Sequence, residues 1–133
     1  MVARFNSLDG ARLVLLAQKD DRLRHFIAAG VRRMGWDVAE VRDDRDLDAA
    51  LQRHPTLANS ALLVVDVRAS APSSLLEAIP RTRTRLPTIV ISEADDDAMR
   101  TARRVGANMV FATPFDVDDL CTALLFLSRA GQA

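Results

Sequence analysis

Five polar residues stand at or just after the ends of apolar segments, and their side chains could together carry out chemistry on an anionic group. They are Gln18, Lys19, Asp66, Ser92 and Thr113. A carboxylate can act as a nucleophile, a hydroxyl can donate a hydrogen bond to an anionic oxygen, and an ammonium group can balance a negative charge. These residues form one site only if the fold brings the ends of their segments together.

The apolar segments are predicted to be strands of a parallel sheet. The runs 13–17 and 61–65 are continuously apolar, which is typical of strands that are buried on both faces. The predicted strands are 12–18, 36–41, 61–66, 87–92 and 108–112. Asp66 then lies at the carboxyl end of a buried strand.

Helices are predicted between these strands, at 21–34, 43–53, 72–82, 95–105 and 116–129. In the first of them, Asp20 or Asp21 can cap the amino end and Gly35 can end the helix. Its predicted apolar face consists of Leu23, Phe26, Ile27, Val31 and Met34. Strands that alternate with helices through short connections predict an α/β fold with right-handed crossovers and helices on both faces of the sheet.

In such a sheet the functional site lies beyond the carboxyl ends of the strands, near the point where the strand order reverses. That rule brings the five polar residues to one edge. No glycine-rich loop follows the first strand, so the sequence argues against a dinucleotide or nucleoside-triphosphate site. His25 and His54 are isolated from each other and from the single cysteine, which argues against a metal cluster of these residues.

Length and composition narrow the class of protein further. The 133 residues suit one domain, 1–133, with a core at about 11–129. A formal net charge of zero gives no reason to expect direct contact with nucleic acid. The sequence shows neither a signal peptide nor a long apolar span, so we expect a cytoplasmic protein without membrane contact. Cys121 lies in an apolar pattern and is interpreted as a packed thiol.

The segment 14–127 resembles a bacterial response-regulator receiver domain of the chemotaxis-regulator type. The resemblance is carried by the strand that ends at Asp66, by the strand 89–92, by Gly106-Ala107 and by Thr113-Pro114-Phe115. It implies a flavodoxin-like (βα)5 fold with a five-stranded parallel sheet in the order 2-1-3-4-5, and a role in two-component phosphorelay signalling.

The same resemblance implies roles for individual residues. Asp66 takes the phosphoacceptor position, and Ser92 takes the position of the hydroxyl that senses the phosphoryl group. A serine that merely bonds the local backbone is the alternative for Ser92. Receivers also need a cis peptide before the proline, so we expect the Thr113-Pro114 bond to be cis.

The sequence departs from the receiver pattern at the metal site. Gln18 and Lys19 stand where receivers carry two acidic residues that hold magnesium. Magnesium requires oxygen ligands with negative charge among them, and Asp66 beside an ammonium group is a poor substitute. We therefore expect no metal ligand and no cofactor. An alignment that moves the acidic pair to Asp20 and Asp21 disturbs the spacing to the end of the helix, although Asp20 still borders the pocket.

Two further departures concern the phosphoryl group and its relay. Thr113 stands where receivers carry a lysine, and Val110 stands where they usually carry an aromatic ring. We expect the Lys19 ammonium to contact Asp66 directly or through one water, as a replacement for the metal; a solvated Lys19 is the alternative. Together the substitutions favour a degenerate receiver, or pseudo-receiver.

The outer faces of the last two helices are the predicted interface. Leu125 and Phe126, with Ala123, fall outside the expected core stripe of the final helix, and Arg100 and Arg103 lie on the helix before it. With Val110, these residues are expected to form a homodimer surface. Solvated arginines and a single exposed aromatic ring are the alternative interpretation.

The favoured hypothesis is a non-enzymatic signalling module of a two-component system that works by protein–protein interaction. Its partner would be a histidine kinase or a downstream regulator. One alternative is a working receiver that a histidine kinase phosphorylates on Asp66. A second is the N-terminal regulatory domain of a nucleic-acid-binding regulator, which requires an output segment beyond Ala133.

Overall fold

The computed structural model describes residues 13–53, 61–68, 86–104 and 106–132. The predicted helix 72–82 and His54 lie outside these ranges. The strands are β1 (Leu13–Ala17), β2 (Asp37–Val41), β3 (Ala61–Asp66), β4 (Thr88–Ser92) and β5 (Met109–Ala112). The described helices are α2 (Asp21–Arg33), α3 (Asp44–Arg53), α5 (Asp96–Arg104) and α6 (Val117–Gln132).

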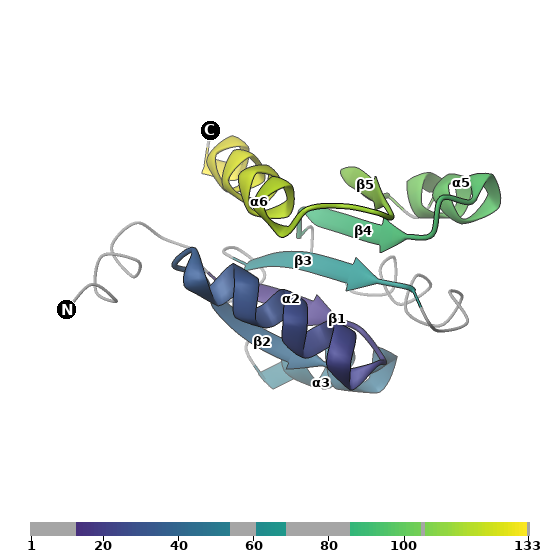
Figure 1. The fold of residues 1–133 in the computed structure, drawn as a ribbon. Helices are drawn as coiled ribbons and strands as arrows, with labels where there is room; N and C mark the ends of the chain where they lie inside the picture. Colours follow the sequence, from purple (N-terminus) through teal and green to yellow (C-terminus); the bar gives the residue numbers. More distant parts are fainter. Residues whose placement is uncertain (1–12, 54–60, 69–85, 105, 133) are drawn as a thin grey trace.

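The strands form one parallel sheet in the order β2-β1-β3-β4-β5, which confirms the predicted fold class (Figure 1). Leu13 is in register with Asp37 on one side and with Ala61 on the other. Strands β1 and β3 therefore lie inside the sheet, and every residue of β3 is buried. The continuous apolar runs are explained by this double coverage, because both faces of these strands must avoid water.

The described helices cover both faces of the sheet (Figure 1). Val14 and Leu16 of β1 pack in the cluster that contains residues of α2 and α6. Leu15 points to the opposite face and packs in the cluster that contains residues of α3 and α5. Successive side chains of a strand alternate between the two faces, so one short apolar strand contributes to both clusters. Among the described residues, no helix is both long and apolar enough to cross a membrane.

Local sequence signals explain where the helices begin and end. The Asp20 carboxylate accepts a hydrogen bond from the Leu23 amide at 3.0 Å and caps α2. Gly35 follows α2 with φ 97° and Gly106 follows α5 with φ 99°, a conformation in which glycine is the favoured residue. The end of α6 was predicted near residue 129, but the helix continues to Gln132.

The predicted apolar face of α2 is wrong in part. Ile27 and Val31 are buried, whereas Phe26 is 69% exposed and Met34 is also exposed. Gly30 is buried instead, and a Cβ atom placed on it would lie only 2.6 Å from Cγ1 of Val117. The start of α6 thus packs closely against the glycine. Phe26 is about 100° away from Ile27 around the helix and falls outside the buried face, while Met34 lies beyond the last helical residue.

Candidate functional site

Asp66 ends β3 with its side chain fully buried, and an arginine two residues later neutralises it. Nη2 of Arg68 donates to Oδ2 at 2.7 Å, and Nε donates to Oδ1 at 2.9 Å. The Arg68 amide also donates to Oδ1, at 3.0 Å. The paired donors match the planar geometry of a carboxylate, which makes this a strong type of ion pair.

The guanidinium of Arg68 is enclosed by further groups. Its central carbon lies 5.1 Å from the centroid of the Phe115 ring. The Phe115 ring makes an edge contact with the Phe111 ring, with 6.1 Å between the two ring centroids. The side chain of Arg68 is 17% exposed. Hydrogen bonding to Asp66, together with the negative charges of Asp66 and Glu93, raises the pKa of Arg68 against the opposing effect of burial. Arg68 is therefore held as a fixed cation at the end of the sheet.

Gln18 connects the exits of β1 and β3. Its buried side chain donates from Nε2 to the Arg68 carbonyl oxygen at 3.2 Å, and its Oε1 accepts from the Asp20 amide at 2.7 Å. Lys19 is exposed and, within the part of the chain that the structure describes, forms no ion pair with Asp66. The predicted direct contact from Lys19 to Asp66 is therefore wrong, and the contact through one water stays a prediction. Arg68 reaches the carboxylate from the loop that follows Asp66 itself.

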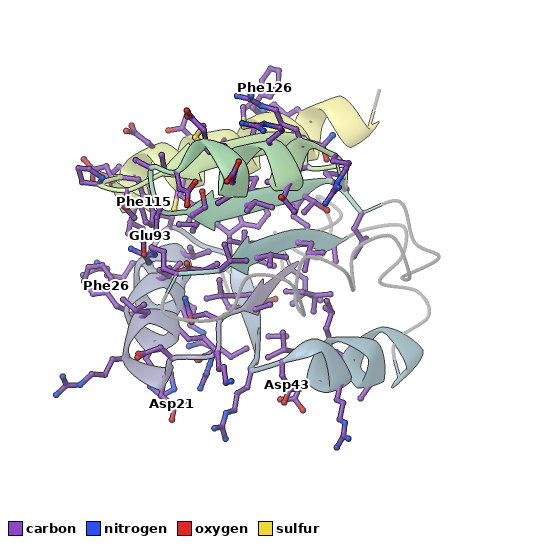
Figure 2. All side chains as sticks on the ribbon, turned by 90° about the vertical axis from the view of Figure 1, so that its right-hand side faces the viewer. Asp21, Phe26, Asp43, Glu93, Phe115 and Phe126 are labelled. Carbon is purple, nitrogen blue, oxygen red and sulfur yellow. The ribbon has the colours of Figure 1, made fainter. Side chains whose placement is uncertain are left out.

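Both hydroxyl residues of the predicted pocket, Ser92 and Thr113, donate hydrogen bonds to Glu93. Ser92 is fully buried and donates to the Glu93 carbonyl oxygen at 2.9 Å, which is the local backbone bond of the alternative interpretation. The Thr113 hydroxyl donates to Oε2 of Glu93 at 3.2 Å. The Thr113-Pro114 peptide is cis, as predicted. Figure 2 shows Glu93 and Phe115 at the same end of the sheet.

A second arginine fixes the loop between β1 and α2. Arg24 is buried, and its guanidinium donates to Asp21 at 2.8 Å, to Glu40 at 3.1 Å and to the Gln18 carbonyl oxygen at 3.0 Å. Arg32 donates to the other oxygen of Glu40 at 3.1 Å. These bonds connect α2, β2 and the end of β1, so they set the position from which Gln18 reaches Arg68.

Sequence reasoning missed the roles of Arg68, Glu93 and Arg24. The signal for Arg68 was its position two residues after the strand end at Asp66, but spacing alone did not separate it from Lys19, which follows the end of the neighbouring strand. Phe115 was recognised only as part of the Thr113-Pro114-Phe115 motif, without a contact assigned to its ring.

The oxygen atoms of this site do not fit a divalent cation. Both carboxylate oxygens of Asp66 already accept hydrogen bonds from Arg68, and the Asp20 carboxylate caps α2. The Arg68 carbonyl oxygen accepts from the Gln18 amide. Within the described ranges, no three His, Cys, Asp or Glu side chains are grouped as metal ligands. A magnesium ion would have to share Asp66 with a guanidinium of the same charge sign.

The residues of the predicted interface differ in exposure. Arg100, Arg103 and Phe126 are exposed, and the Phe126 side chain projects from the outside of α6 (Figure 2). Leu125 is half-buried, and Val110 is half-buried against the cluster that includes Leu15 and Ala102. The assignment of Ala123 to the outer face is wrong, because Ala123 is buried in the core between the sheet, α2 and α6.

Comparisons with known proteins give a consistent result for the fold. No family model matches the sequence, and no curated protein matches it. A response-regulator receiver domain from Bermanella marisrubri has a TM-score of 0.74 at 21% identity, over 88% of this chain and 98% of the other.

Two further solved structures agree. A two-component response regulator from Clostridium difficile has a TM-score of 0.77 at 10% identity, over 91% of this chain and 98% of the other. The receiver domain of a putative Luxo repressor protein from Vibrio parahaemolyticus has a TM-score of 0.74 at 18% identity, over 92% of this chain and 93% of the other. With the strand order, these likenesses show that the chain has the fold of response-regulator receiver domains.

Proposed function

We propose that this chain is a cytoplasmic, non-enzymatic signalling module that works through protein–protein contacts and does not use magnesium-dependent phosphorylation of Asp66. The observation that carries this proposal is the state of the Asp66 carboxylate, which is fully buried and held at both oxygens by Arg68. A phosphoacceptor needs a free oxygen to attack the phosphorus atom. Here that attack requires the ion pair to open first.

The substituted residues around Asp66 support the same function. A receiver neutralises the incoming phosphoryl group with a metal and a lysine, whereas this chain has Gln18 and the exposed Lys19 at the metal positions and Thr113 in place of the lysine. Gln18 donates to a backbone carbonyl, and Thr113 donates to Glu93. Neither side chain presents a positive charge to an anionic group on Asp66. Partner binding is therefore the output that remains for the fold.

Intact-mass measurement after treatment with acetyl phosphate and magnesium tests this function. We expect no added phosphoryl group on the wild-type chain. Asp66→Asn is the matched control, because an adduct that persists in this variant lies at another residue. A phosphoryl adduct that forms on the wild type and is lost in Asp66→Asn would establish the alternative function, a working phosphoacceptor.

For the partner surface, we propose self-association through α5 and α6. Phe126 is 61% exposed on α6, and α5 presents Arg100 and Arg103. Figure 1 shows that α5 and α6 flank the edge strand β5. Burying a large aromatic side chain between two copies would remove apolar area from water, which is the main driving force of such contacts.

Sedimentation at increasing protein concentration tests the association. We expect Phe126→Asp to convert a concentration-dependent dimer to a monomer. Phe26→Asp provides a matched control, because Phe26 is 69% exposed but lies on α2. A wild type that stays monomeric at high micromolar concentration, or a dimer that only Phe26→Asp dissociates, would exclude this surface.

A further inference from the structure

We infer that the guanidinium of Arg68 is the built-in replacement for a divalent cation, so that Asp66 needs no metal and Arg68 excludes one. The biological meaning of this inference rests on the proposed function. The inference itself concerns a separate physical property, namely which cation neutralises the Asp66 carboxylate. It assigns Arg68 a positioning role: the side chain fixes the charge and orientation of Asp66. Lys19, the residue that the sequence favoured for this role, is exposed.

The first argument is the match between the groups that a metal would contact and those that Arg68 contacts. Three donor groups of Arg68, namely its amide, Nε and Nη2, bind the two oxygens of Asp66 at 2.7 to 3.2 Å. A buried carboxylate without a compensating charge is strongly unfavourable. Because Asp66 is fully buried, its charge requires such a partner, and Arg68 supplies it from the same chain.

The second argument is that the surroundings hold the guanidinium in place. The Phe115 ring lies against it at 5.1 Å, and the negative charge of Glu93 also favours the cation. Gln18 donates to the Arg68 carbonyl oxygen, an atom that would otherwise be available as a metal ligand. An ammonium group in this place would lack the paired donors and the flat face that contact Asp66 and Phe115.

A double-mutant cycle tests the positioning role. Urea unfolding is followed by the fluorescence of Trp36, the single tryptophan, which is buried. Arg68→Met and Asp66→Leu complete the cycle with Asp66→Leu/Arg68→Met. Arg68→Met should shift the midpoint to lower urea, and the double variant should restore a large part of that shift, because both charges are then removed. Arg33→Met is the matched control, since Arg33 is exposed at the end of α2, outside the proposed α5 and α6 surface, and it should unfold like the wild type.

Arg68→Lys separates charge from geometry and remains available if Arg68→Met fails to fold. We expect Arg68→Lys to unfold at a lower urea concentration than the wild type, because a single ammonium cannot reproduce the paired hydrogen bonds. A cycle without coupling between Asp66 and Arg68, or an Arg68→Lys variant as stable as the wild type, would overturn the inference.

Magnesium titration tests the exclusion of a metal. Gln18→Asp/Lys19→Asp places two carboxylates near Asp66 while Arg68 remains, and adding Arg68→Ala removes the guanidinium. We expect the triple variant to bind magnesium at least about tenfold more tightly than the double variant, measured by calorimetry. Equal affinity in the two variants would show that Arg68 does not exclude the metal.

These results separate the inference from the proposed function. Phosphorylation of wild-type Asp66 would refute the proposed function, even if the urea cycle showed strong coupling between Asp66 and Arg68. An unmodified Asp66 with no coupling would refute the role of Arg68 and leave the proposed function intact.

Discussion

Two arginines lie at the carboxyl edge of the sheet, and they neutralise negative charge in different ways. Arg24, with 7% of its side chain exposed, divides its bonds among Asp21, Glu40 and a backbone carbonyl. Arg68, with 17% exposed, directs its side-chain donors to the single carboxylate of Asp66. Glu40 has a second cationic partner in Arg32, whereas Arg68 is the ion-pair partner that the described residues give Asp66.

The comparison shows that the buried fraction of an arginine does not by itself predict how much its removal would lower the free energy of unfolding. The cost depends on what remains when the guanidinium is removed. Without Arg24, Asp21 is still 59% exposed to water and Glu40 still contacts Arg32. Without Arg68, a fully buried carboxylate is left without the ion-pair partner that the described residues give it. The more exposed of the two arginines is therefore expected to be the more important for stability.

The largest expected effect is that of Arg68→Ala. Removing one partner of a buried ion pair leaves the other charge uncompensated, at a cost of about 3–5 kcal/mol. Urea unfolding followed by Trp36 fluorescence measures this loss in the free energy of unfolding. A loss smaller than that of Arg24→Ala would reverse the comparison.

Arg24→Ala should have the next largest effect. The variant loses hydrogen bonds to charged groups and to the Gln18 carbonyl oxygen, which corresponds to about 1.5–3 kcal/mol. The same unfolding measurement applies, with Arg33→Ala at the end of α2 as the exposed control. Amide hydrogen exchange should show the loss of protection concentrated in the loop after β1. Loss of protection concentrated around Asp66 would mean that the hydrogen bonds of Arg24 and those of Arg68 depend on each other.

Phe115→Leu should have a smaller effect that depends on Arg68. Loss of the cation–π contact corresponds to about 0.5–2 kcal/mol, in addition to any loss of packing against Phe111. In the Arg68→Met background, Phe115→Leu loses only packing. The difference between its effects on the free energy of unfolding in the two backgrounds therefore measures the cation–π contact. Equal effects in both backgrounds would show that the ring contributes through packing alone.

Asp21→Asn should have the smallest effect, a small loss of stability at neutral pH that disappears in acid. The hydrogen bond from Arg24 holds the pKa of Asp21 below its ordinary value of 3.8. Its contribution to stability is therefore present above that value and is lost as the pH falls through the lower folded pKa. The variant should lose a small part of the acid-side slope of the unfolding midpoint. An unchanged slope would assign that pH dependence to other carboxyl groups.

The pKa of Arg68, by contrast, is raised from an ordinary value that already lies far above the neutral range. The cationic form of Arg68 that the ion pair needs is therefore present at every pH below the unfolded pKa of Arg68, and it is lost only as the pH rises through the folded value. Across the neutral range, the Arg68 shift should produce no pH dependence. Titration of Arg68 therefore contributes nothing to the pH dependence of stability in acid, which is the quantity that Asp21→Asn tests.

The sequence predicted the sheet well, because the apolar runs that form it leave few alternatives. Strand β3 was predicted at 61–66, where it is found, since a continuous apolar run needs cover on both faces. The face of α2 was predicted less well. The buried face of α2 includes Gly30, which packs against Val117 of α6 through a contact distant in sequence, and the apolar pattern of α2 alone did not indicate that contact.

The site was predicted in its location but not in its main interaction. Gln18, Asp66, Ser92 and Thr113 do lie near one edge of the sheet, as parallel strands require. The cation beside Asp66 could not be chosen from spacing alone, because Lys19 and Arg68 both follow strands that end there. The choice depends on the loop after β3, where the backbone of Arg68 turns back to bond Asp66.

The contact between Gly30 and Val117 also limits which substitutions this fold can accept. Glycine within a helix costs about 1 kcal/mol of helix propensity relative to alanine, so replacing it would ordinarily be favourable. At this position any side chain would push Val117 away, because its Cβ would lie 2.6 Å from Cγ1 of Val117. Val117 begins α6 two residues after Phe115, whose ring covers the Arg68 guanidinium. A gain in the local stability of α2 would therefore be coupled to a displacement at the Asp66 site.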